Sequence, residues 1–151
     1  ARIFLRELAG EEFKGEKIPL RYYDLSRLLW PFDFPTDPED GIESVQVKLL
    51  RLMPIDSPSE RYTLECLRKA NRSIWDAAAD RFDSSNPLDG GYLVTQVRLT
   101  IRFHAAGGNR RSKTLPLTIT MPNGCDLKGK TERERLIGEK YLQRWGLLRD
   151  V

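Results

Sequence analysis

Two runs of alternating apolar and polar residues, separated by a Gly-rich segment, constrain the fold of this chain more than any other feature. Every second residue of 93–103 is apolar or Thr, and the alternation returns over residues 113–121. A period of two is typical of a β-strand with one buried face. The intervening residues 104–112 are rich in Gly and polar side chains. We therefore expect a long antiparallel hairpin with one buried face and one exposed face.

Shorter patterns on either side of this hairpin predict further elements. We expect strands over residues 2–8, 43–53 and 61–67, and helices over residues 22–30, 73–82 and 131–145; a helix is the competing interpretation for residues 61–67. In the strand 43–53 the apolar phase changes after Leu49, which predicts a β-bulge near residues 49–51.

The C-terminal helix has the clearest signal in the sequence. Thr131 and Glu134 have the spacing of a capping box, in which each side chain accepts a hydrogen bond from the backbone N–H of the other residue. Apolar residues follow at spacings of three and four, which is typical of a helix with one buried face. The residues expected on that face are Leu136, Ile137, Tyr141, Trp145 and Leu148.

The order of these elements predicts an α+β fold. Its sheet should be largely antiparallel and built from hairpins, with the helices packed mainly on one face. The length suits a single domain over residues 1–151, and the missing N-terminal Met is compatible with a fragment of a larger protein. We expect the core to include Val97, Leu99, Ile101, Leu117, Ile119, Ile137, Tyr141 and Trp145.

The composition argues against several classes of function. Two cysteines, a single histidine and no C-x-x-C pair cannot supply a zinc site, so we expect no metal and no cofactor. No Ser or Cys nucleophile pairs with His104 by any local signature, so we interpret this histidine as an exposed loop residue and favour a protein without catalytic activity. No window approaches 18 consecutive apolar residues, so we expect no contact with a membrane. Two cysteines do not indicate a disulfide framework, so we expect a reducing, cytoplasmic location.

Positive charge gathers on the polar face of the predicted hairpin. No Asp or Glu occurs between Tyr92 and Cys125, although a face built only for solubility usually mixes both signs. Arginine also favours bidentate contacts with phosphate. We therefore predict a non-catalytic binding module that contacts a polyanion, nucleic acid in the first place and with weak sequence specificity. The predicted contacts are Arg98, Arg102, Arg110, Arg111 and Lys113.

Two other functions are compatible with the sequence. The same face, or an edge of the sheet, could bind a protein, and the chain would then be an interaction or scaffolding domain. The third interpretation is a small metal-dependent nuclease, because an acidic segment precedes a strand that carries Gln46 and Lys48. Short motifs of this kind often match by chance, and Gln would be a neutral ligand. The acidic residues are Asp33, Asp37, Glu39 and Asp40.

Overall fold

The computed structural model describes residues 21–67, 70–105 and 113–150, and every structural statement below concerns these residues. The strands are β1 (Arg21–Tyr23), β2 (Ile42–Pro54), β3 (Tyr62–Glu65), β4 (Tyr92–Phe103), β5 (Thr114–Thr120), β6 (Gly124–Cys125) and β7 (Leu148–Asp150). The α-helices are α2 (Ile74–Phe82) and α3 (Glu132–Arg144). Short 3-10 helices are η1 (Ser26–Leu29), η2 (Pro38–Asp40), η3 (Asp83–Ser85), η4 (Pro87–Asp89) and η5 (Asp126–Gly129).

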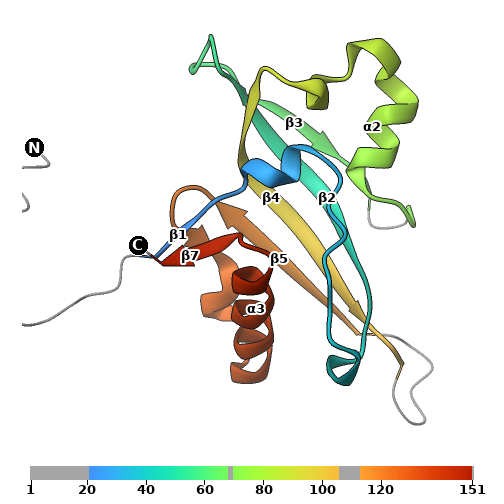
Figure 1. Cartoon of the computed structure of the whole chain (residues 1–151), viewed down its shortest axis with the longest axis vertical. Helices are drawn as coiled ribbons and strands as arrows, with labels where there is room; N and C mark the ends of the chain where they lie inside the picture. The colour runs from blue at the N-terminus through green and yellow to red at the C-terminus, as the bar shows by residue number, and fades with distance from the viewer. Residues whose placement is uncertain (1–20, 68–69, 106–112, 151) are drawn as a thin grey trace, which may run out of the picture.

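The protein has an α+β fold with an antiparallel sheet, as the sequence predicts (Figure 1). Five strands form the main sheet in the order β3-β2-β4-β5-β6, and each strand runs antiparallel to its neighbours. A second sheet pairs β1 with β7. No helix in the described part of the chain is long and apolar enough to cross a membrane.

The helices cover one face of the main sheet. Trp75 of α2 donates its indole N–H to the carbonyl oxygen of Leu28 in η1, at 2.9 Å. Phe34 stacks on Trp75 at a centroid distance of 5.9 Å and meets Trp145, just after α3, edge-on at 4.9 Å. One aromatic cluster therefore joins both helices and the segment between η1 and η2 above the same apolar surface, where such pairs add to the free energy gained by burial.

The predicted core is confirmed at seven of its eight positions. Val97, Leu99, Ile101, Leu117, Ile119, Tyr141 and Trp145 are all fully buried, whereas Ile137 is only partly buried. The capping box of α3 is also confirmed, because Thr131 and Glu134 exchange both hydrogen bonds. The prediction is wrong for Leu136, which is 63% exposed, while Leu142 is fully buried in the helix–sheet interface. Leu136 is one residue before Ile137 and five before Tyr141, so the turn of the helix places it on the side away from the buried stripe.

The predicted helix over residues 22–30 is wrong in its first half. Residues 21–23 form β1, which pairs with β7, and only residues 26–29 are helical, as the 3-10 helix η1. The helical spacing in the sequence does mark core residues, since Leu25, Leu28 and Leu29 are buried. The sequence gives no signal for β7, a three-residue strand that becomes visible only through its pairing. The strand expected over residues 2–8 lies outside the described residues.

Three register shifts interrupt the ladder between β2 and β4, and the first lies at its end, between Ile42 and Ser44. The second lies between Val47 and Leu49, which leaves Lys48 as an extra residue close to the predicted bulge. The third lies between Arg51 and Leu52 and leaves Thr95 as an extra residue on β4. Beyond this point the alternation is reversed, so Val94 is buried and Leu93 is exposed. The sequence pattern places Leu93 and Thr95 with the buried residues, and that prediction is wrong.

Truncation of the two leucines on β4 tests this assignment of faces. We expect Leu99→Ala to lower the free energy of unfolding by about 2–5 kcal/mol, because it opens a cavity in the core. The matched control is Leu93→Ala on the same strand, which should change it by about 0.5 kcal/mol or less because the side chain is already 47% exposed. Urea denaturation measures both, and equal losses would contradict the assignment.

Candidate polyanion-binding face

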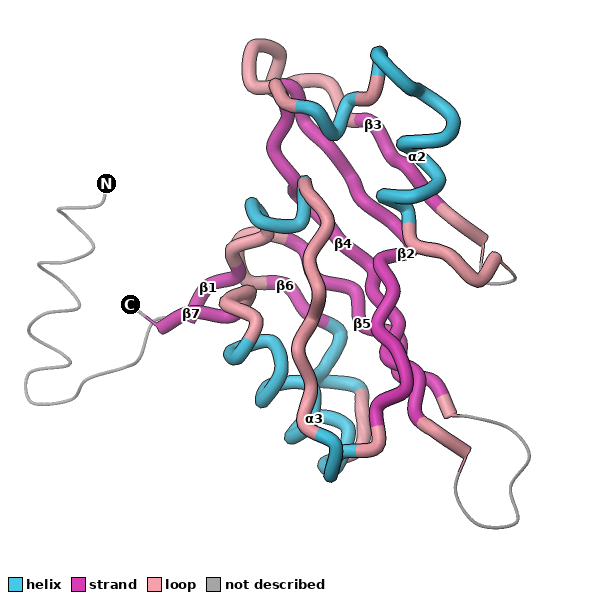
Figure 2. Tube along the Cα trace, turned by 45° about the vertical axis from the view of Figure 1, so that its right-hand side comes forward, coloured by secondary structure: helices cyan, strands magenta, loops and turns pink. Residues whose placement is uncertain are grey.

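The main sheet has a second face, opposite the helices, which we call the open face. The ladder pairs Arg51 with Gln96 and Ser44 with Arg102 between β2 and β4, and Arg98 with Thr118 between β4 and β5. Other residues on this face are Gln46, Glu65, Thr100, Thr114 and Thr120. Most side chains here are polar or positively charged, with one carboxylate from β3, and the register also places the apolar Leu49 and Pro116 beside Arg98 and Thr100. Figure 2 shows the sheet running from α2 towards the far ends of β4 and β5.

Arg98 lies on the open face as predicted, but it is paired. Its guanidinium donates to the carboxylate of Glu65, and the two side chains are 33% and 43% exposed. Leu49 of β2 is opposite Glu65 on one side and opposite Arg98 on the other, so the pair reaches across the middle strand. The sequence between Tyr92 and Cys125 has no acid, yet β3, on the far side of β2, supplies one.

Arg102 makes no ion pair within the described residues and lines a hollow of about 150 Å³ on the open face. Beside it lies Lys48, which is only 4% exposed although it carries a charge. The Lys48 ammonium donates to the carbonyl oxygens of Ala70 and Arg72 at 2.5 and 2.9 Å. Burial lowers the pKa of Lys48, and the nearby positive charge of Arg102 lowers it further. The remaining lining residues are Ser44, Gln46, Thr100 and Thr114.

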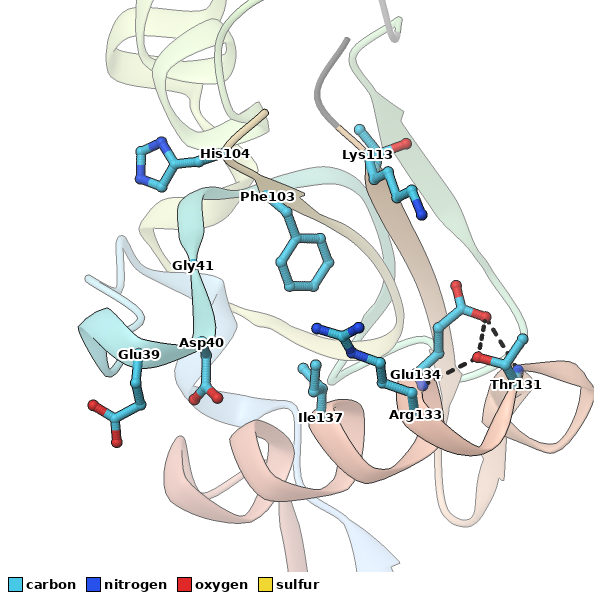
Figure 3. A pocket seen from close by; sticks show the side chains of 11 residues that line it. Glu39, Asp40, Gly41, Phe103, His104, Lys113, Thr131, Arg133, Glu134 and Ile137 are labelled. Carbon is cyan, nitrogen blue, oxygen red and sulfur yellow. Dashed lines mark hydrogen bonds between the residues drawn. The ribbon is translucent and has the colours of Figure 1, made fainter. Parts of the chain in front are cut away.

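Lys113 lies immediately before β5 and lines a different and larger space, a cleft of about 690 Å³. The cleft lies between η2, the end of the β4–β5 hairpin and the first turn of α3 (Figure 3). Phe103 and Ile137 give it an apolar centre, and the Arg133 side chain extends between them in this view. Thr114 lines both the cleft and the hollow.

The structure therefore brings some of the predicted contacts together and separates others. Arg98 and Arg102 share the open face, whereas Lys113 belongs to the cleft. Arg110 and Arg111 lie outside the described residues. Lys48 and Arg51 are two further cations of this face that the sequence pattern does not identify as contacts. The change of apolar phase after Leu49 was the sequence signal for Lys48, because it predicts a β-bulge and bulges often lie next to functional sites.

The remaining site candidates have simpler structural explanations. His104 is exposed on the wall of the cleft, and its backbone N–H donates to the carbonyl oxygen of Gly41. Tyr92 packs against the edge of the core and meets Tyr62 edge-on at 6.2 Å. The open face of the described strands consequently carries no aromatic side chain.

The acidic segment before β2 is engaged by α3. Asp37 and Asp40 both accept from Lys140, at 3.0 and 2.6 Å; Arg144 also binds Asp37, and the Tyr141 hydroxyl binds Asp40. These hydrogen bonds hold the pKa of both carboxyls below the usual value.

The nuclease interpretation needs these acids beside Lys48. Lys48 is six residues beyond Ile42, where β2 begins, which is about 20 Å along an extended strand at roughly 3.3 Å per residue. The structure does not bring together the acids and the lysine of the nuclease interpretation. Among the described residues, no cluster of three or more His, Cys, Asp or Glu side chains could hold a metal ion.

The comparisons with known proteins do not add a family to this picture. The chain matches no protein-family model, and no curated protein or solved structure is significantly similar to it.

The contacts between the acidic segment and α3 predict a pH dependence of stability. A carboxyl whose pKa is lower in the folded state stabilises the fold above its unfolded pKa of 3.8, and this contribution is lost as pH falls through the folded value. We expect the free energy of unfolding to drop below about pH 5, and to drop less steeply in Asp37→Asn. The control is Asp33→Asn, an exposed acid of the same segment with no ion pair in the described residues. Urea denaturation between about pH 2 and pH 7 measures the three curves, and parallel curves would contradict the prediction.

Proposed function

We propose that the open face is a non-catalytic binding surface for a polyanion, and that its ligand is nucleic acid. The observation that carries this proposal is the charge balance of a sheet face that the described helices leave uncovered. Arg51, Arg98, Arg102 and Lys48 contribute four positive charges, and Glu65 is the carboxylate that offsets one of them.

The distribution of these cations suits a phosphate backbone. Arg98 and Arg102 are four residues apart on one strand, so their Cα atoms are about 13 Å apart at roughly 3.3 Å per residue. Neighbouring phosphates of a strand are closer than that, so the two arginines would contact phosphates separated by at least one other. Contacts of this type fix position without reading sequence, which makes the proposed binding weakly sequence-specific. The absence of aromatic side chains on the open face, within the described strands, also argues against base stacking as the main contribution.

A protein partner is the alternative occupant of this face, and the response to salt separates the two. Binding to phosphates releases counterions, so the affinity should fall steeply as the salt concentration rises. A protein held by apolar contacts or by strand addition at β3 would respond weakly.

Removal of both arginines tests the proposal. We expect Arg98→Ala combined with Arg102→Ala to weaken the binding of DNA or RNA and to make the plot of log affinity against log salt shallower by about two units, about one for each lost phosphate contact. The control is Arg81→Ala, which removes an exposed arginine of α2 and should leave the slope unchanged. Fluorescence anisotropy at several salt concentrations measures the slope. The proposal fails if the unmodified protein binds neither duplex DNA, single-stranded DNA nor RNA at low salt, and the protein partner then takes its place.

A substitution at Glu65 should act in the opposite direction. Glu65→Gln removes the carboxylate that neutralises Arg98 and keeps a side chain of similar shape. We expect nucleic-acid affinity to rise by up to about fivefold, which is the size of a partly exposed ion pair of up to about 1 kcal/mol. A decrease in affinity would show that Arg98 must be held by Glu65 in order to bind, whereas an unchanged affinity would place the ligand elsewhere. Arg98→Ala is measured beside it in the same anisotropy assay, because a ligand that binds elsewhere should be unaffected by both substitutions.

A further inference from the structure

The hollow beside Arg102 has a lining that is unusual for the surface of a protein. Its six lining residues supply an arginine, a lysine, three hydroxyl groups and one amide, and none of the six is acidic. A Lys that is only 4% exposed normally has a carboxylate partner, because removal of an unpaired charge from water is costly. Lys48 instead donates hydrogen bonds to two backbone carbonyl oxygens and lies near the positive charge of Arg102. Two neighbouring cations in a site without an acid favour an anionic ligand.

The donors around the hollow suit a tetrahedral oxyanion. The guanidinium of Arg102 offers a planar group that matches two phosphate oxygens at once. Two of the three ammonium N–H groups of Lys48 are used by Ala70 and Arg72, which leaves one for a ligand. The hydroxyls of Ser44, Thr100 and Thr114 can donate as well, since none of them donates a hydrogen bond within the described residues.

The size of the hollow narrows the choice of ligand. At about 150 Å³ it is well below the roughly 300–1,000 Å³ of sites that enclose a drug-sized molecule. It has room for a phosphate group but not for a whole nucleotide. A phosphate in the middle of a nucleic-acid strand has a sugar on both sides and one negative charge, whereas a terminal phosphate can enter a recess end-on. A terminal phosphate also carries a charge of about −1.5 to −2 at pH 7, which matches the two cations of the site.

We propose that this hollow binds the terminal phosphate monoester of a nucleic-acid strand, with Arg102 and Lys48 as the charged contacts and Ser44, Thr100 and Thr114 as neutral donors. The inference rests on the proposed function, because the rest of the strand would lie along the open face. It adds a preference for phosphorylated strand ends, which a uniformly cationic face does not have.

A titration with inorganic phosphate tests the hollow without nucleic acid. We expect saturable chemical-shift changes in a ¹⁵N-labelled protein at the backbone amides of Thr100 and Arg102, and no such changes in Arg102→Ala. A chloride titration at equal ionic strength is the control for general screening. Phosphate shifts that do not saturate, or that chloride reproduces, would overturn the inference.

Three oligonucleotides of one sequence test the preference for strand ends. They carry a 5′-phosphate, a 3′-phosphate or no terminal phosphate, and their affinities are compared by anisotropy at one salt concentration. We expect one of the phosphorylated strands to bind about tenfold more tightly than the unphosphorylated strand, because the terminal phosphate adds charge-assisted hydrogen bonds. Arg102→Ala should remove this preference. The matched control is Arg51→Ala, which removes a cation of the same face outside the hollow and should weaken all three strands while the preference remains.

The two proposals fail in different ways. Equal affinities for the three strands would overturn the terminal-phosphate inference and leave the binding face intact. No binding by any strand would overturn the proposed function, and the phosphate titration would then decide the hollow on its own. A preference that persists in Arg102→Ala would place the terminal phosphate elsewhere and would also overturn the inference.

Discussion

Burial of only one face of the five-stranded sheet is the constraint on which the rest of the structure depends. The apolar side chains of β2, β4 and β5 must be covered, and the chain covers them from one side with η1, α2 and α3. Phe34 connects the layer because its ring contacts both Trp75 and Trp145. Since all of the apolar cover lies on that side, the open face carries polar groups and is available for a ligand.

The features that the sequence predicted well are those determined over short distances along the chain. The alternation in β4 and β5, the capping box at Thr131 and the burial of Trp145 each follow from residues within a few positions of one another. The features that it missed depend on which strands become neighbours. Glu65 meets Arg98 only because β3 and β4 both pair with β2, and no local pattern specifies that pairing. The same reasoning applies to β7, which exists as a strand only beside β1.

The site shows this difference most clearly. Charge counted along β4 predicts a purely cationic surface, but charge counted across the described strands gives a neutralised Arg98, and an Arg102 that has no ion pair among the described residues and lies beside a buried lysine. Interpretation of Lys48 needs the structure, because a lysine in an alternating strand is ordinarily exposed to water. Its burial depends on the extra residue in β2 and on the carbonyl oxygens of the segment that follows β3.

The extra residue at Lys48 also makes β2 tolerant of a change in length at that point. If Lys48 were deleted, Val47 and Leu50 would remain on the buried face and Leu49 between them on the open face, so the alternation would become regular. Deletion of a residue from a regular part of the strand would instead turn every later side chain to the wrong face. Related chains could therefore lose this lysine, and with it the hollow, while they keep the same sheet. A sequence with one residue fewer in this strand would identify a relative that has the fold without the site.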